Sequence, residues 1–421
     1  MDSRRRFLQG AAAAAVVSRT VLGANDRVQM GIIGTGRRGN QVYESFVRNK
    51  DVTFIAACEV AKDRLDEFTA KAGVKMDTYT DYRRVLERKD IDAVLIATPD
   101  HWHSPMTIAA CQAGKDVYVE KPVSNTIEAA VKMLPAARLS KRVVQVGCQQ
   151  RSWHHFQECA KKVHDGYIGQ VNHCVLLFGG GRGRRQLVDT PQQPPAGLDW
   201  EMWQGPAPRR PYTPNRQRSW RSYYDYGGGS VSDWGVHLTD ATLWFMNADR
   251  TAPLLTSASG QYVDMQPPNL DMAPDTFSIT WKYDTWVGTF MNAVLPTSDP
   301  AMGGMSDLYG NYFYGERGVL LVNRYGYQFW PASPGGTPKG ASAVRAERSM
   351  DVKGMSEDPD SQFGSATVRH TRNFLGCVKS RQKPACDIET GFNSTLPTLL
   401  AVLAIRMGRA FKWDGMKAMP A

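Results

Sequence analysis

A glycine-rich turn, Gly34-Thr35-Gly36-Arg37-Arg38-Gly39, lies between an apolar run and a stretch with helical spacing. Gly34 permits a tight turn, Gly36 lets the backbone approach a pyrophosphate, and Gly39 allows close packing of the helix on the strand. The N-terminus of that helix would hold the phosphates. Glycines at this spacing are weak evidence alone. The strand Val28–Ile33 before the turn and the helix after it favour a dinucleotide-binding turn.

An acidic residue, Glu59, ends the next apolar run about 20 residues after Gly39. A carboxylate there accepts hydrogen bonds from the adenosine ribose hydroxyls and repels a 2′-phosphate, so it favours NAD over NADP. Nearby cations weaken this preference and keep NADP as an alternative. They are Arg37, Arg38, Lys62 and Arg64.

Residues 28–147 alternate short apolar runs with amphipathic stretches, which is the pattern of a parallel sheet with crossover helices. This alternation predicts a doubly wound α/β Rossmann domain over residues 27–148. The predicted strands are Val28–Ile33, Val52–Cys58, Asp77–Tyr79, Ala93–Thr98, Asp116–Glu120 and Val143–Gly147. The predicted helices are Gly39–Arg48, Lys62–Lys71, Tyr82–Arg88, Met106–Ala113 and Thr126–Leu139.

The pattern changes after Gln150, and residues 149–421 are predicted to form an α+β domain with a large open, mainly antiparallel sheet. A long stretch from Gly179 to Arg218 lacks periodicity but is rich in aromatic residues, which favours an ordered active-site loop. The predicted strands are Val171–Phe178, Leu255–Tyr262, Asp275–Lys282, Val287–Asn292, Leu308–Tyr314 and Gly318–Asn323, and the predicted helices are Phe156–Val163 and Thr390–Phe411.

A lysine follows the predicted strand Asp116–Glu120, in the segment Glu120-Lys121-Pro122. Ligands of open α/β folds bind at the carboxyl edge of the sheet, where this segment ends. A lysine at that edge can stabilise an alkoxide as hydride leaves. Lys121 alone would be interpreted as a solvated surface residue, but the flanking Glu120 and Pro122 fix a turn where loops converge.

The second candidate pair is Asp233 and His237, which stand four positions apart after the run Gly227–Gly229. On a helix they would share one face, and the aspartate could orient the imidazole. The histidine could then take the hydroxyl proton during oxidation and return it during reduction. Metal binding by His101, His103, Asp233 and His237 is the alternative, but this set lacks an established ligand spacing, so no metal is expected.

These motifs, in this order, resemble the Gfo/Idh/MocA oxidoreductase family over nearly all of residues 27–415. The resemblance implies a Rossmann domain, an open-faced sheet domain that carries substrate specificity, and a homo-oligomer, either dimer or tetramer. It also implies Lys121, Asp233 and His237 as the catalytic set, acting on sugars and cyclic polyols. Glu59 replaces the family's more usual aspartate and leaves the cofactor preference open.

Further site residues are predicted around this set. Trp102 and Tyr226 could stack on a sugar ring and Arg221 could bind hydroxyls, although such aromatic residues more often belong to the core. The predicted cofactor-binding residues are Gly34, Gly36, Arg37, Arg38, Gly39, Glu59, Thr98, Pro99, His103, Glu120, Lys121 and Gln149.

The N-terminus carries Ser3-Arg4-Arg5-Arg6-Phe7-Leu8 and then the small apolar run Ala11–Val17. This pattern predicts a twin-arginine export signal over residues 1–26 and a periplasmic or extracytoplasmic mature protein; the alternative is a frayed basic helix. The apolar run is too short to span a bilayer securely. No later window is expected to span a membrane, and the mature protein is expected to have no membrane contact.

Composition narrows the remaining classes of partner. The net charge of +10 would suit nucleic acid, but several cations lie in the export signal and the rest are dispersed, so no nucleic-acid partner is expected. The 7 cysteines form no CxxC pair, so no disulfide framework is expected.

Export bears on the mechanism, because free nicotinamide nucleotides are scarce outside the cytoplasm. We expect an NAD(P)-dependent oxidoreductase that retains its cofactor and moves hydride to or from a hydroxyl carbon of a sugar, glycoside or cyclic polyol. An NAD-dependent glycoside hydrolase that works by transient oxidation and elimination is the second hypothesis. It ranks lower because the family's glycosidases have a histidine-glycine pattern at Asp233-Trp234-Gly235. The third hypothesis, a non-catalytic sugar-binding accessory protein, conflicts with the intact catalytic set.

Overall fold

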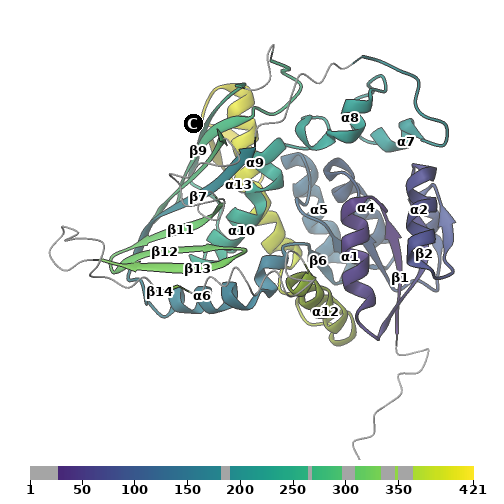
Figure 1. The fold of residues 1–421 in the computed structure, drawn as a ribbon, viewed down its shortest axis with the longest axis horizontal. Coiled ribbons are helices and arrows are strands. Elements are labelled where there is room, and N and C mark those ends of the chain that lie inside the picture. Colours follow the sequence, from purple (N-terminus) through teal and green to yellow (C-terminus); the bar gives the residue numbers. More distant parts are fainter. Residues whose placement is uncertain (1–26, 182–189, 264–267, 296–308, 333–346, 349–363) are drawn as a thin grey trace, which may run out of the picture.

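The computed structural model describes residues 27–181, 190–263, 268–295, 309–332, 347–348 and 364–421. These residues build two sheets with helices packed between and around them (Figure 1). The export signal predicted over residues 1–26 lies outside the described residues.

The first sheet is parallel throughout and has 6 strands in the order β3-β2-β1-β4-β5-β6. This is the doubly wound order, so the predicted Rossmann fold is confirmed. The order reverses between β1 and β4, where the carboxyl ends of the strands leave a crevice for ligands. The elements are β1 (Val28–Ile33), α1 (Arg37–Val47), β2 (Val52–Cys58), α2 (Lys62–Ala72), β3 (Asp77–Tyr79), α3 (Tyr82–Glu87), β4 (Ala93–Ile96), α4 (Asp100–Gln112), β5 (Asp116–Val119), α5 (Ile127–Ser140) and β6 (Val144–Val146).

Helix α4 differs from its prediction, because it begins at Asp100 instead of Met106. Pro105 made the preceding segment read as a loop, since proline removes a hydrogen bond within a helix. Tertiary bonds hold the first turns in place instead. His103 Nδ1 lies 2.6 Å from the carbonyl oxygen of Pro122, and Ser104 donates to the carbonyl of Ala129 at 2.6 Å.

The second sheet has 10 strands in the order β14-β13-β12-β11-β7-β10-β9-β8-β15-β16. Every neighbouring pair is antiparallel except β7 with β10, so the predicted large, mainly antiparallel sheet is confirmed. The strands are β7 (Val171–Gly181), β8 (Leu255–Gln261), β9 (Thr276–Lys282), β10 (Val287–Leu295), β11 (Tyr309–Gly315), β12 (Gly318–Asn323), β13 (Gly326–Pro331), β14 (Glu347–Arg348), β15 (Phe411–Trp413) and β16 (Ala418–Pro420). The last four strands in chain order, β13 to β16, were not predicted.

Three helices cover one face of this sheet: α6 (His154–His164), α10 (Gly235–Phe245) and α13 (Ile388–Met407). Side chains of all three share a core with Phe290 and Phe313 from the sheet. Figure 1 shows α10 and α13 between the two sheets, and none of the described helices lies on the far side of the second sheet. The second sheet is therefore open on one side, as predicted.

Helix α13 corrects the expectation that no later window could span a membrane. It is long and apolar enough to do so by composition, with a mean hydropathy of 1.3, but 78% of that window is buried inside the molecule. Its Leu396 and Leu400 pack in the core that it shares with the first sheet. The apolar composition therefore reflects a helix enclosed on nearly all sides by protein.

Helix α12 (Gly364–Ser380), which was not predicted, returns to the first sheet. Phe374 and Leu375 join the core of β1 and α1. Arg372 and Lys379 both pair with Asp51, in the connection between α1 and β2, and the Lys379 Nζ lies 2.7 Å from it. A segment remote in sequence thus completes the unit built around the first sheet (the first unit). The second sheet and its helices form the second unit.

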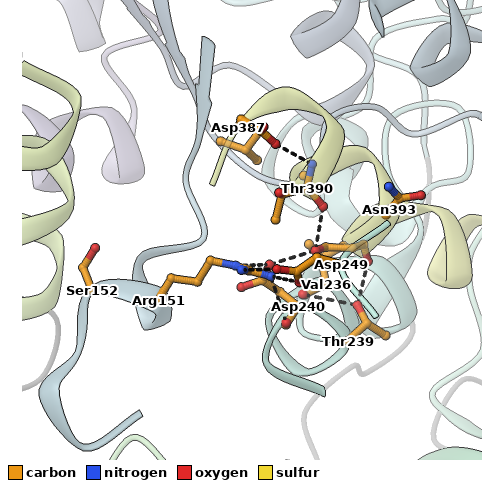
Figure 2. A network of polar contacts seen from close by, with 12 residues as sticks. Arg151, Ser152, Val236, Thr239, Asp240, Asp249, Asp387, Thr390 and Asn393 are labelled. Carbon is orange, nitrogen blue, oxygen red and sulfur yellow. Dashed lines mark hydrogen bonds and ion pairs between the residues drawn. The ribbon is translucent and has the colours of Figure 1, made fainter. Parts of the chain in front are cut away.

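A buried ion network joins the end of the first unit to the second (Figure 2). Arg151, in the short helix η2 (Gln149–Ser152), is 6% exposed. Its Nε donates to Asp240 Oδ1 at 2.8 Å, and its terminal nitrogens reach both oxygens of Asp249 at 2.6 and 3.0 Å. Ser394 on α13 also donates to Asp240, at 2.8 Å. The network fixes η2 against α10 and α13.

Candidate active site

One cavity of about 590 Å³ lies at the carboxyl edge of the first sheet and is lined by both units. It brings together most of the residues predicted for the site, although they are spread along the chain from the glycine turn to α10. Those that line it are Gly34, Gly36, Arg37, Arg38, Glu59, Thr98, Pro99, Trp102, His103, Glu120, Lys121, Gln149, Arg221, Asp233 and His237.

The glycine turn has the shape that its sequence indicated. Gly34 has a φ of +91°, and a Cβ there would lie 2.8 Å from the carbonyl oxygen of Ala97. A Cβ on Gly39 would lie 2.0 Å from the carbonyl oxygen of Gly34, so Gly39 serves close helix packing and does not itself line the cavity. No side chain caps the N-terminus of α1, where Gly36 is the N-cap residue. Its amides can therefore receive an anion.

Glu59 has a structural task in addition to its predicted one. Its carboxylate accepts backbone N–H bonds from Thr35 at 3.0 Å, Val60 at 2.9 Å and Ala61 at 3.2 Å. Burial raises the pKa of Glu59, against the opposing effects of Arg64 and these N–H bonds. The carboxylate thus holds the glycine turn through Thr35. It also lines the cavity, and its contact with a ribose remains a prediction.

Arg38 and Glu120 form an ion pair across the crevice. Arg38 donates through Nε to Glu120 Oε1 at 2.9 Å, and its Nη2 lies 2.8 Å from the same oxygen. Gly147 lets this carboxylate approach β6, since a Cβ there would lie 2.6 Å from Glu120 Oε1. Glu120 therefore positions α1 relative to the edge of the sheet.

Lys121 and Asp233 join the two units at the centre of the cavity. Lys121 Nζ donates to the carboxylate Oδ1 of Asp233 at 2.6 Å and to its backbone oxygen at 2.6 Å. Arg221, in helix η3 (Trp220–Ser222), places its Nε 3.4 Å from the same Oδ1. Burial would raise the pKa of Asp233, but Lys121 and Arg221 together lower it. The aspartate is thus ionised and holds the lysine.

His237 is placed differently from the expectation. The helical path is interrupted at Trp234, so Asp233 ends α9 (Gly229–Asp233) while His237 lies in α10. The expected partnership of Asp233 with the imidazole is therefore wrong, because the carboxylate is bonded to Lys121. Among the described residues, the buried Nδ1 of His237 has no hydrogen-bond partner. Burial, reinforced by Lys121 and other cations, lowers the pKa of His237 well below its usual range.

The other histidines of the proposed metal set bond to backbone oxygens. His101 Nε2 lies 3.1 Å from the carbonyl oxygen of Trp203, and burial lowers the pKa of His101 to about 3. His103 lies between the carbonyl oxygens of Pro122 and Thr98, at 2.6 and 2.9 Å. His103 thus ties the start of α4 to the segment that carries Lys121.

The aromatic residues divide between the cavity and the core. Trp102 lines the cavity and donates through Nε1 to the carbonyl oxygen of Trp203 at 2.9 Å. Tyr226 is 0% exposed, is absent from the lining and packs edge-on against Trp203 at 4.8 Å. The predicted substrate contact of Tyr226 is therefore corrected to a core position, because the side chain packs in a cluster with Trp200 and Tyr223.

Asp100 and Arg324 are among the lining residues that were not predicted from the sequence. Asp100 opens α4 and is 4% exposed. Arg324, in the turn between β12 and β13, lies 4.8 Å over the ring of Trp234. Asp100 comes two positions after the end of the predicted strand Ala93–Thr98, so its place at the sheet edge was a usable signal. No sequence signal marked Arg324, because only the tertiary fold brings the turn between β12 and β13 to the cavity.

Comparisons with known proteins identify both units. Residues 28–148 match the NAD-binding Rossmann fold of an oxidoreductase family, and residues 181–291 match the C-terminal alpha/beta domain of the same family. A glycosyl hydrolase family 109 protein of Saccharopolyspora erythraea is 31% identical over 170 residues, which cover 38% of this chain and 35% of that protein. Myo-inositol 2-dehydrogenase of Thermotoga maritima is 30% identical over 143 residues, which cover 34% of this chain and 42% of that protein.

These matched segments span well under half of the length of either relative. Solved structures resemble the chain over more of its length. A levoglucosan dehydrogenase in complex with NADH and levoglucosan superposes with a TM-score of 0.67 at 16% identity, covering 92% of this chain and 100% of that one. At that identity the likeness speaks for the fold.

Proposed function

The chain belongs to the Gfo/Idh/MocA oxidoreductase family, and we propose that it moves a hydride between a retained NAD cofactor and a hydroxyl-bearing carbon of a sugar, glycoside or cyclic polyol. The observation that carries the proposal is the single cavity, which the glycine turn, Lys121 and His237 line together. A dinucleotide on the glycine turn and a substrate at Lys121 would thus share one cavity.

The residues suit NAD on chemical grounds. The uncapped N-terminus of α1 offers backbone amides for the pyrophosphate, and the Glu59 carboxylate disfavours a 2′-phosphate. Arg37 and Arg64 also line the cavity and keep NADP as the alternative. When bound, the nicotinamide ring would supply the acceptor or donor of the hydride.

Lys121 and His237 divide the work on the substrate hydroxyl. Asp233 fixes the Lys121 ammonium, which can give a further N–H to the substrate oxygen and stabilise an alkoxide. The imidazole of His237 stays neutral because burial lowers its pKa, so it can accept the hydroxyl proton. Asp233 acts through the lysine and is a positioning residue.

The substrate class rests on the cavity and on the relatives. Trp102 offers an aromatic surface to a sugar ring, and Arg221 offers hydrogen-bond donors to its hydroxyls. The related proteins named above act on an inositol and on levoglucosan by name, which supports polyhydroxylated rings. We further propose that the chain is exported through its twin-arginine segment and associates with copies of itself through the open sheet.

The deciding experiment is mass spectrometry of the cofactor released from denatured, purified protein. We expect stoichiometric NAD. NADP would overturn the role given to Glu59, and protein that stays free of cofactor even after incubation with NAD would support the sugar-binding accessory alternative. Bleaching or appearance of NADH absorbance with a panel of polyols and sugars tests hydride transfer directly.

Glycoside cleavage through transient oxidation is the second candidate function. It is favoured by the relatives named as glycosyl hydrolase family 109 proteins, which match parts of this chain at 31% and 38% identity. Release of chromophore from chromogenic glycosides without added NAD would support it, and silence across a broad panel would count against it.

A further inference from the structure

The cavity holds one carboxyl group more than the mechanism above uses. Three acidic residues line it at the substrate end: Asp100, Glu120 and Asp233. Glu120 is paired with Arg38, and Asp233 with Lys121. Within the described part of the chain, no hydrogen bond or ion pair reaches the carboxyl of Asp100. It is the member of this group with no partner of its own.

The surroundings of Asp100 favour its protonated form. Burial raises the pKa of Asp100 to about 8, although Arg221 opposes the shift and Asp233 adds to it. Lys121 lowers this pKa and Glu120 raises it, by smaller amounts. The N-terminus of α4 would favour the anion, but it is outweighed by burial. The site therefore pairs a carboxyl that carries a proton with a neutral imidazole, His237, that lacks one.

We propose that Asp100 is the acid that protonates a departing substrate oxygen, so that the substrate is a glycoside whose ring carries an oxidisable hydroxyl. The proposal rests on the proposed function, since cleavage begins from the ketone that hydride transfer produces. Asp100 lines the same cavity as Lys121, the residue proposed to hold the oxygen of that ketone, so both can face one sugar ring.

The step balances as an elimination. Oxidation leaves a ketone at C3, and His237 passes the hydroxyl proton on to water and becomes neutral again. The acidified C2 proton then passes to His237, its electron pair forms the C1=C2 double bond, and the C1–O bond breaks. The leaving oxygen takes the proton of Asp100 and departs as an alcohol. Water addition reverses the roles: the Asp100 carboxylate takes a proton from water, the hydroxyl adds to C1, and His237 returns the proton to C2. No net oxidation occurs in either step.

The test compares Asp100→Asn with wild type on glycosides that share one sugar and differ in their leaving group. Asparagine keeps the shape but cannot donate a carboxylic proton. The rate to measure is that of the first turnover, before water addition can limit it. We expect release of the alcohol from an alkyl glycoside to fall by about 100-fold or more, and release of 4-nitrophenolate from a 4-nitrophenyl glycoside by about tenfold or less, because 4-nitrophenolate leaves without protonation. The control is Glu87→Gln at an exposed position, which should leave both rates unchanged.

Two other results would overturn the proposal. An equal loss on every leaving group would make Asp100 a positioning residue. Wild-type protein that reduces its bound cofactor with a 1,5-anhydro sugar, yet cleaves no glycoside, would refute the acid role and leave the oxidoreductase function intact. Absence of both reactions would refute the proposed function as well.

Discussion

At the scale of single residues, the site combines groups whose protonation states are set by neighbours far away in sequence. Lys121 follows β5, Asp233 ends α9, and the two meet at 2.6 Å. His237 is held neutral in the same cavity. The chemistry thus depends on one fixed cation and one neutral base that do not bond to each other.

Replacing either group should stop turnover without emptying the cofactor site. We expect Lys121→Ala and His237→Ala each to lower the rate of hydride transfer by at least about 100-fold, since each removes a charge or a proton acceptor at the reacting oxygen. Cofactor content, measured by mass spectrometry, should stay at the wild-type level. Near-normal rates in both variants would refute the mechanism.

Residues whose role is local were predictable, and residues whose role is made by the fold were not. The glycines of the turn were recognised because their spacing, between an apolar strand and a helix, indicates a shape that depends only on local sequence. The partner of Asp233 was assigned wrongly, because spacing placed His237 beside it while the tertiary fold brought Lys121. Arg324 entered the cavity from a turn between strands that no local pattern connects to the site.

At the scale of elements, the docking of η2 on α10 depends on the buried guanidinium of Arg151. Arg151→Ala leaves Asp240 without its buried cation, and we expect the free energy of unfolding to fall by about 3–5 kcal/mol. Urea denaturation measures this loss. The matched control is Arg138→Ala, which removes a pair whose arginine is 58% exposed and should cost about 1 kcal/mol or less. Equal losses would mean that the network in Figure 2 contributes little.

Helix α12 should add stability at neutral pH that is lost in acid. Burial would raise the pKa of Asp51, but Arg372 and Lys379 lower it to about 2. A carboxyl with a lowered pKa stabilises the folded state above its unfolded pKa of 3.8, and the contribution is lost as pH falls towards 2. Arg372→Ala should therefore cost about 1 kcal/mol of unfolding free energy near pH 7.

The pH dependence separates this effect from a general loss of packing. The difference between wild type and Arg372→Ala should shrink as urea denaturation is repeated between pH 4 and about pH 2. A difference that stays constant over that range would assign the effect of Arg372 to packing of its alkyl chain.

Elements with strong periodicity were predicted well, and elements that depend on remote contacts were not. All strands of the first sheet were found, because apolar runs alternate with helices at regular spacing. Helix α4 was started too late because Pro105 masked its first turns. The parallel pairing of β7 with β10 could not be foreseen, since strand order depends on how the whole second unit closes.

At the scale of the whole molecule, the open sheet leaves large side chains uncovered. Met291, Tyr314 and Trp330 are 49%, 40% and 38% exposed, and each follows a buried phenylalanine on its strand. Successive side chains of a strand point to opposite faces, so these three lie on the side away from α10 and α13. Large apolar side chains exposed on one face of a sheet are a feature of contact surfaces.

We expect Met291→Glu to convert an oligomer of this chain into monomers, because a charge would be buried in the contact. Size-exclusion chromatography with light scattering measures the mass. Leu139→Glu, at a position that is 82% exposed on α5, is the matched control and should leave the mass unchanged. A wild-type protein that runs as a monomer would refute the use of this face.

The bond between Lys121 and Asp233 also limits how such a protein can diversify. Each unit supplies one partner of this bond. A chimera that joins this first unit to the second unit of a relative therefore has an active site only if the relative's counterpart of α9 places a carboxylate next to Lys121. The exposed face of the second sheet and the aromatic-rich segment before α9 can be exchanged more freely. Chimeras of related proteins should therefore keep activity when the substrate-contacting residues change, and lose it when the position of α9 changes.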